Sequence, residues 1–178
     1  MRRALALALL LSACGPVAQA PSLSAAETWR DPAVTVASKA DFDPASFAGV
    51  WHEAARLPVA FQSDCAAGRW RVGLPAGDVA TLRTTCLDAN GTTVRRLDGT
   101  VRHGRLGRMR ATLDARAWDG DLWVLWTDTT YRSAVVAAPD GRAAWILDRA
   151  ERMPADRLRA AREVLRFNGY AVDAMVVR

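Results

Sequence analysis

The residues with the clearest potential for chemistry in this 178-residue chain are two histidines, three cysteines and one strand carboxylate. Neither His52 nor His103 has a partner at a spacing typical of metal ligands. The sequence contains no Gly-x-Ser-x-Gly elbow and no glycine-rich phosphate loop. Glu53 is the one carboxylate that strand alternation would turn inward; we leave open a general base, a ligand contact and, favoured, a solvated side chain. We therefore predict no catalytic residues, no metal site and no cofactor.

The first cysteine, Cys14, lies where bacterial lipoproteins are acylated. Two arginines precede an apolar run at 4–11, which is too short to span a membrane and is typical of a signal peptide. Residues 11–14 (Leu-Ser-Ala-Cys) look like a lipobox, whose cysteine thiol receives a diacylglycerol before cleavage. Cleavage after Ala20 is the alternative, but Pro21 would then make a poor substrate. We predict a lipoprotein signal peptide at 1–13 and lipidation, including palmitate, at Cys14.

Export of the chain affects the interpretation of the other cysteines and of the charge. An envelope compartment is oxidising, so Cys65 and Cys86 are predicted to form a disulfide bond. Two separate buried thiols are the alternative. Removal of residues 1–13 takes away two arginines and lowers the formal net charge from +5 to +3. That small positive surplus does not indicate nucleic-acid binding.

The elements that must position these residues are mostly short strands. Residues 14–40 are rich in Ala, Pro, Ser and Thr, which predicts an acylated, flexible tether. A domain at 41–178 follows, in which apolar and polar residues alternate between turn signals such as Asn90-Gly91. We expect strands at 48–57, 69–74, 79–87, 92–102, 108–115, 122–127, 131–138 and 143–149.

After the eighth strand the periodicity becomes helical. Leu158 and Leu165 lie at helical spacing, Pro154 suits the first turn, and Gly169 suits the position after the last turn. A last short strand is expected at 170–177. The predicted fold class is all-β: an eight-stranded, up-and-down antiparallel β-barrel with a C-terminal α-helix and a short final strand. Such a barrel has an interior just wide enough for one small ligand.

Three segments far apart in the sequence carry a family resemblance. Gly49-Val50-Trp51 begins the first strand, residues 127–132 follow the sixth, and residues 145–149 (Trp-Ile-Leu-Asp-Arg) form the eighth. Their order, over roughly residues 42–178, resembles the lipocalins, and in particular the bacterial outer-membrane lipoprotein lipocalins. The resemblance implies a cup-shaped, lipocalin-like barrel that holds an apolar ligand.

Alternating strand direction predicts which segments meet at the closed end of such a barrel. They are the base of the first strand, the turn after the sixth strand and the foot of the eighth. The resemblance makes Gly49, Trp51 and Arg149 structural residues there, with the Arg149 guanidinium stacked on the Trp51 indole. His52 stands where relatives usually have tyrosine.

The same alternation places Cys65 and Cys86 together near the open rim. A tight turn centred on Pro75-Ala76 pairs residues whose numbers sum to about 151, as the numbers of the two cysteines do. That register allows the predicted disulfide.

Ligand contacts are expected inside the barrel. Trp145 has the inward parity expected in the eighth strand, and Trp123 fits the sixth strand of the family. With Glu53 and Tyr131 they are the candidate ligand-binding residues. For each aromatic residue taken alone, an ordinary core position is favoured over a ligand contact, because barrels fill their interiors with large side chains. Six arginines between 95 and 110 are interpreted as a solvated hairpin face rather than a site for anionic headgroups.

The predicted function is non-covalent binding of a small apolar or lipid-like ligand. The resemblance suggests a lysophospholipid or fatty acid, bound for storage, scavenging or transfer in the bacterial envelope. Gly15, rather than Asp, after Cys14 implies an outer-membrane protein facing the periplasm. The expected partners are that ligand and the membrane, without nucleic acid, and no oligomeric state is predicted. An envelope enzyme acting on an apolar substrate, or a filled barrel serving as an interaction module, are the alternatives.

Overall fold

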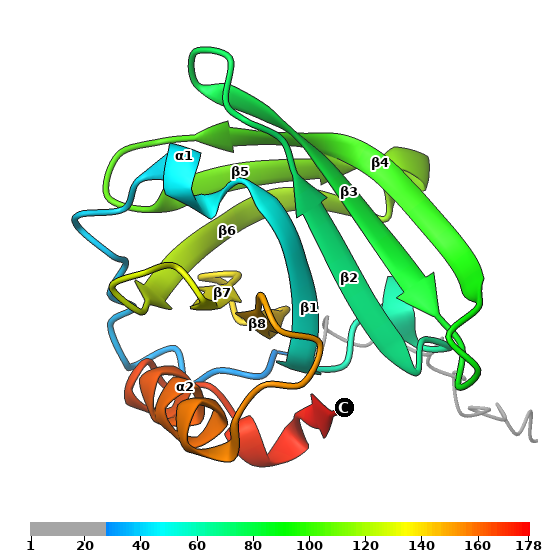
Figure 1. Ribbon diagram of the computed structural model, residues 1–178. Helices are drawn as coiled ribbons and strands as arrows, with labels where there is room; N and C mark the ends of the chain where they lie inside the picture. Colours follow the sequence, from blue (N-terminus) through cyan, green and yellow to red (C-terminus); the bar gives the residue numbers. More distant parts are fainter. Residues whose placement is uncertain (1–27) are drawn as a thin grey trace, which may run out of the picture.

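The computed structural model describes residues 28–178, and its strands form one closed sheet (Figure 1). The strands are β1 (Gly49–Arg56), β2 (Ala67–Val72), β3 (Val79–Leu87), β4 (Thr93–His103), β5 (Arg108–Leu113), β6 (Trp118–Thr127), β7 (Ser133–Ala137), β8 (Ala144–Asp148) and β9 (Val176–Val177). They are hydrogen-bonded in the order β2-β3-β4-β5-β6-β7-β8-β1-β9, and a further pairing of β2 with β1 closes the barrel. The predicted fold class is confirmed. The predicted signal peptide and Cys14 lie outside the described residues.

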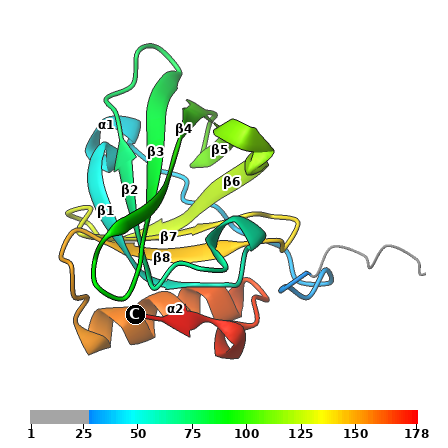
Figure 2. The same ribbon diagram turned by 90° about the vertical axis from the view of Figure 1, so that its right-hand side faces the viewer.

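Within residues 28–178, two α-helices and three short 3-10 helices complete the fold. They are α1 (Pro44–Phe47), η1 (Ala60–Gln62), η2 (Asp114–Arg116), α2 (Ala155–Phe167) and η3 (Val172–Ala174). In Figure 2, α2 lies against the outside of β7 and β8. Gly169, with φ of 83°, follows its C-cap Asn168, because a glycine accepts the left-handed conformation that ends a helix.

The burial of each strand follows from what covers its outer face. In β5 the residues alternate between exposed and buried along the whole strand, because one face meets the interior and the other meets solvent. Every residue of β7 and β8 is buried. Leu147 packs in the interior cluster, whereas Ile146 packs outside the barrel with Leu165 of α2. The continuous apolar sequence of these two strands reflects this burial on both faces.

Two expected boundaries were wrong. Residues 119–121, which precede the strand expected at 122–127, lie inside β6, where Asp119 pairs with Arg110 of β5 at 2.8 Å. The turn-like composition of Asp-Gly-Asp was overridden by this cross-strand pairing. Residues 170–177 form mostly η3 and a bridge at Tyr170, so that the last strand is only Val176–Val177.

The predicted register of β2 and β3 was also wrong, although the disulfide is confirmed. Gly68 lies opposite Cys86, so paired numbers sum to 154 rather than 151. The turn is shifted because Gly77 takes a positive φ of 64° and Ala76 bridges Val79 across it. Cys65 lies just before β2 and still reaches Cys86, with a Cα–Cα distance of 5.2 Å.

Part of the predicted tether is packed on the barrel. The Trp29 N–H donates to the Gly141 carbonyl at 2.8 Å, and the Trp29 carbonyl accepts from Ala171 at 2.7 Å. Further on, the Lys39 N–H donates to the Val124 carbonyl at 2.8 Å. Residues 29–39 therefore belong to the folded domain, because their main-chain polar groups pair with it rather than with water.

The mouth of the barrel as candidate functional site

The closed end is built around one arginine and one tryptophan. Trp51 is fully buried, and the Arg149 guanidinium carbon lies 3.6 Å from the centre of its ring. The Trp51 indole N–H donates to the Phe47 carbonyl at 2.8 Å. Arg149 donates to five carbonyl oxygens, those of Ser46, Phe47, Ala48, Val50 and Tyr131. The guanidinium therefore ties α1, β1 and the β6–β7 turn together.

Gly49 is required by the same arrangement. Its φ is 111°, a backbone conformation that side chains other than hydrogen disfavour. A Cβ at this position would lie 2.9 Å from Nη1 of Arg149. The glycine two residues before Trp51 thus makes room for the guanidinium.

Tyr131 belongs to this closed end, and its prediction as a ligand-binding residue needs correction. Its hydroxyl accepts a hydrogen bond from the Asp43 N–H at 2.7 Å, and its ring packs 6.3 Å from that of Phe42. The β6–β7 turn that carries it lies at the opposite end of the barrel from the mouth. Strand direction alone indicates this placement.

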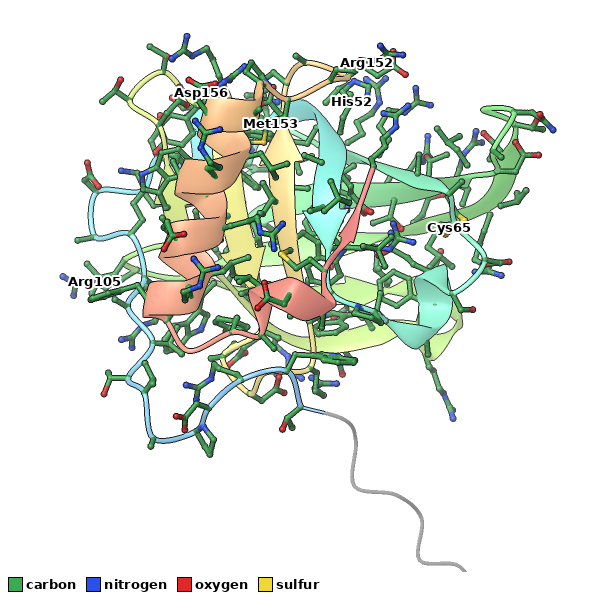
Figure 3. All side chains as sticks on the ribbon, turned by 90° about the horizontal axis from the view of Figure 1, so that it is seen from below. His52, Cys65, Arg105, Arg152, Met153 and Asp156 are labelled. Atoms are coloured by element: carbon green, nitrogen blue, oxygen red, sulfur yellow. A yellow bond between two sulfur atoms is a disulfide. The ribbon has the colours of Figure 1, made fainter. Side chains whose placement is uncertain are left out.

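The open end is partly covered by residues 58–65, which include η1 and are called the lid below. Arg56 donates to the main-chain carbonyls of Gln62 at 3.1 Å and Cys65 at 2.6 Å. Arg95 donates to the Phe61 carbonyl at 2.7 Å and forms a two-pronged ion pair with Asp64. The Cys65–Cys86 disulfide, whose Cys65 is labelled in Figure 3, fixes the end of the lid to β3.

Below the lid, one glutamine side chain joins two predicted ligand residues. The Gln62 carboxamide nitrogen donates to Oε1 of Glu53 at 2.8 Å, and its oxygen accepts from the Trp145 indole N–H at 2.9 Å. The Trp70 indole N–H also donates to Oε1 of Glu53, at 2.7 Å. Glu53 and Trp145, 92 positions apart in the sequence, thus meet through Gln62.

Glu53 is a buried carboxyl group, only 2% exposed, rather than the solvated side chain that the sequence favours. Burial raises its pKa, while the hydrogen bonds from Gln62 and Trp70 and the Arg56 guanidinium, 3.8 Å away, oppose that rise. Oε2 has no hydrogen-bond partner among residues 28–178. A Cβ at Gly68 would lie 2.1 Å from this carboxyl group, so the glycine provides its space.

A pocket of about 550 Å³ opens beside the lid and is called the mouth pocket below. It is lined by Trp29, Arg56, Pro58, Val59, Ala60, Phe61, Gln62, Ser63, Ala117, Trp118, Arg142 and Val176. Next to it, inside the barrel, the Trp145 ring packs 5.2 Å from Trp70 and 5.8 Å from Trp118. The mouth pocket therefore lies at the rim of the barrel, between the lid and Trp118.

Trp123 lies outside the barrel, contrary to its prediction as a ligand contact. Trp118, Leu122 and Val124 of the same strand pack in the interior, so the odd-numbered Trp123 points outward. There it packs beside the outer cluster, with the Arg108 guanidinium 4.5 Å from its ring centre. The resemblance to the sixth strand of the family correctly predicts that Trp123 lies in a strand. It does not determine whether the side chain points into the barrel or out of it.

The arginines between 95 and 110 do not form a single site. Arg95 pairs with Asp64 at the mouth, whereas Arg102 pairs with Asp78 near the closed end. Arg110 pairs with Asp119 and Asp121 on the outer face. This pairing agrees with a solvated, ion-paired surface.

Sequence reasoning missed the lid and the residues beside it. Gln62, Phe61 and Arg56 bear on the site because the chain after β1 folds back over the mouth, and Val176 reaches it from the far end of the sequence. The sequence signal for the lid was Pro58, which follows the first strand, together with Cys65, which is predicted to form a disulfide at the rim. Together they required this segment to cross the opening.

Residues 28–178 can also be described in terms of membrane-spanning helices and groups of possible metal ligands. No helix within residues 28–178 is long and apolar enough to cross a membrane. In the same range, the grouping with metal-ligand spacing is Asp64, Cys65 and Cys86, and both of its sulfurs are joined in the disulfide.

Comparisons with known proteins place the chain in a family. A model of the lipocalin-like domain matches residues 42–178, so the chain belongs to the lipocalin-like family. Among curated proteins, none matches its sequence.

Solved structures agree with this assignment. The chain is similar to insecticyanin from the tobacco hornworm Manduca sexta, with 23% identity over 80% of this chain and 83% of that chain and a TM-score of 0.63. It is similar to lobster apocrustacyanin A1, with 15% identity over 81% and 88% and a TM-score of 0.60. It is also similar to the siderocalin Ex-FABP, with 17% identity over 74% and 93% and a TM-score of 0.56. At these identities the likeness shows the fold alone.

Proposed function

We propose that this protein binds a small apolar or lipid-like ligand in the mouth pocket, with fatty acids and lysophospholipids as the first classes to test. The observation that carries the proposal is the pocket itself, about 550 Å³ in volume and walled largely by aromatic and aliphatic side chains. That size and lining are typical of small-molecule sites. Burial of the apolar part of a ligand against Phe61, Trp118 and Val176 would supply affinity.

The polar groups of the pocket support a role in orienting such a ligand. Arg56 and Arg142 are the charged side chains of the lining. Arg142 is stacked on Trp118, 4.6 Å from its ring centre, and is paired with Asp140. A binding role is further supported by the siderocalin Ex-FABP, which is described as functioning through dual ligand specificities.

The location that we propose is the bacterial outer membrane, with a lipid anchor on Cys14 and the domain facing the periplasm. Storage, scavenging or transfer of a lipid-like ligand would suit that place. Trp29, fifteen positions after Cys14 in the sequence, is part of the pocket lining. An anchored protein would therefore hold the mouth near its attachment point. Cys14→Ser should abolish incorporation of labelled fatty acid and release the protein from membranes; continued membrane retention would reject the anchor.

A pair of neighbouring substitutions tests the pocket. Val176 and Val177 are equally exposed, at 45%, on the same short strand, but only Val176 lines the pocket. Val176→Glu should weaken binding of oleate and of lysophosphatidylcholine by about tenfold, because the longer, hydrated side chain takes apolar wall and space away from the ligand. Val177→Glu is the matched control and should leave both affinities unchanged. The measurement is the quenching of tryptophan emission in titrations of folded protein.

Two results would reject this function. The first is the absence of saturable binding for several apolar ligand classes, which would favour an interaction module. The second is a ligand that is recovered chemically altered after incubation, which would favour an enzyme. We expect saturable binding and an unchanged ligand.

A further inference from the structure

The carboxamide of Gln62 is bound inside the barrel by one donated and one accepted hydrogen bond, as the polar group of a ligand would be. It donates to Glu53 at 2.8 Å and accepts from Trp145 at 2.9 Å. The orientation is dictated by chemistry, because an indole N–H can only donate and Oε1 of Glu53 is the acceptor. Gln62 is 3% exposed although it belongs to the lid rather than to a strand. One polar side chain from a rim segment thus fills a donor–acceptor site in the interior.

The site around this carboxamide is formed by the strands and not by the lid. Glu53 comes from β1 and Trp145 from β8. Both side chains are at least nine-tenths buried, and Gly68 of β2 leaves the volume that the Glu53 carboxyl group occupies. Oε2 of Glu53 remains without a hydrogen-bond partner among the described residues. A buried carboxyl oxygen in that state provides an additional acceptor for a donor group.

We propose that Gln62 occupies the position of the ligand's polar group, and that the ligand which displaces it is a neutral amphiphile carrying a carboxamide or an equivalent neighbouring donor and acceptor. This inference rests on the proposed function, which supplies the apolar part of the same ligand. Gln62 lines the mouth pocket and also contacts Glu53. Its side chain therefore lies between the pocket and the hydrogen-bonding groups of Glu53 and Trp145. A ligand in the pocket touches the side chain that it has to replace.

The geometry favours an amide over a carboxylate in this position. An amide group would reproduce both hydrogen bonds, one to Glu53 and one from Trp145. A carboxylate has no N–H for Glu53 and would bring two buried acidic groups together, which disfavours ionisation of both. Arg56 offsets only part of this penalty, because its single positive charge already faces Glu53 across 3.8 Å and its Nη2 is bound to two main-chain carbonyls of the lid.

Displacement does not require the whole lid to unfold. The lid is held through main-chain carbonyls, by Arg56 and Arg95, and through the disulfide at Cys65. None of these contacts uses the Gln62 side chain. Rotation of that side chain toward the mouth pocket breaks its two hydrogen bonds, and the amide of the ligand replaces them.

The test compares oleamide with oleate, two probes with the same hydrocarbon chain, by equilibrium dialysis at about pH 8. The unmodified protein should bind oleamide about tenfold more tightly than oleate, the factor expected for one well-formed hydrogen bond at a buried site. Gln62→Ala removes the competing carboxamide and should raise the affinity for oleamide by about tenfold while changing that for oleate little. Val177→Ala, beside the pocket but outside its lining, is the matched control and should change neither.

A second variant tests the acceptor. Glu53→Gln removes the acidic group and introduces a donor, so it should lower the affinity for oleamide and raise that for oleate. Its folding is checked by circular dichroism, and the comparison on the unmodified protein stands even where this variant fails to fold.

The outcomes separate this inference from the proposed function. If both probes bind one saturable site with equal affinity, or Gln62→Ala changes both alike, the surrogate role of Gln62 is wrong while apolar binding stands. If neither probe binds, both the inference and the proposed function are wrong. Tighter binding of oleate than of oleamide overturns the inference directly.

Discussion

The two ends of the barrel each hold an ionisable side chain beside tryptophan, the half-buried Arg149 at one end and the buried Glu53 at the other, yet the polar groups of the two are satisfied differently. At the closed end, Arg149 stacks on Trp51 and donates to five main-chain carbonyls. At the open end, Glu53 accepts from two side chains, and its second oxygen lacks a hydrogen-bond partner among residues 28–178. Main-chain partners cannot leave without unfolding. Side-chain partners from a rim segment can be replaced by a ligand.

A glycine accompanies the charge at each end, and the comparison extends to these residues. Gly49 combines a positive φ with close approach of Arg149, so that both backbone and space demand it. Gly68 takes an ordinary φ and is required only for the volume of the Glu53 carboxyl group. The closed end is therefore constrained in backbone and side chain, whereas the open end is constrained by side-chain volume. Under the proposed function, this difference gives fold stability to one end and ligand exchange to the other.

The largest effect is expected from Arg149→Ala. It leaves several carbonyl groups short of a donor and removes the cation–π contact, so the free energy of unfolding should fall by about 4 kcal/mol. Chemical denaturation gives this value. The ratio of ligand affinities measured on the folded variant should stay unchanged. Arg110→Ala, which removes an exposed ion-paired arginine on the outer face, is the control and should cost about 0.5 kcal/mol. A selective loss of ligand affinity with normal stability would reverse the assignment of the two ends.

The disulfide variant should have the next largest effect. Cys65 and Cys86 close a loop of 21 residues in sequence separation. Replacing both by serine should lower the free energy of unfolding by about 3 kcal/mol, because the unfolded chain is then less restricted. In the unmodified protein, intact-mass analysis should show that neither cysteine alkylates under denaturing conditions until it is reduced. Free alkylation of both thiols in oxidised protein would contradict the bridge.

Acidification should affect the two ends in opposite directions. Burial lowers the pKa of His103, at the closed end of β4, below its ordinary value of 6.5 in spite of the nearby Asp78. The unfolded chain then takes up a proton that the folded protein does not, so stability is lost as pH falls through about 6.5. Burial instead raises the pKa of Glu53 above 4.5, so its contribution to stability grows as pH falls through that raised pKa.

Two variants separate these contributions in denaturation curves between about pH 7 and pH 4.5. His103→Leu should flatten the loss of stability on acidification, and Glu53→Gln should steepen it. His52→Gln serves as a control for the other histidine, whose pKa burial also lowers. A change of the same sign in the His103 and Glu53 variants would contradict the pKa directions assigned to the two ends.

The strands could be predicted because alternation and turn signals depend on residues close together in the sequence. The site could not, because it depends on contacts between residues far apart in the sequence. Alternation and turn signals place eight strands within a few residues, and Val79–Leu87 is predicted to the residue. The face of Trp123 is not local, since it depends on where β6 begins and on the irregularity between Val124 and Trp126. Gln62 shows the same limit more sharply. A polar residue in a loop carries no period, and its partners lie 9 and 83 positions away.

The most direct test of the account is to map where an amphiphile binds. A fatty amide that carries a photoreactive diazirine on its chain would be bound, illuminated and located by peptide mass spectrometry. The account predicts that labelling is confined to the mouth pocket, at the lid, Trp118 or Val176, and is suppressed by excess oleamide. The groove on the outer face beside α2, whose Met153 and Arg152 are labelled in Figure 3, should remain unlabelled. Labelling of that groove, or of the closed end around Trp51 and Arg149, would contradict the assignment of ligand binding to the open end.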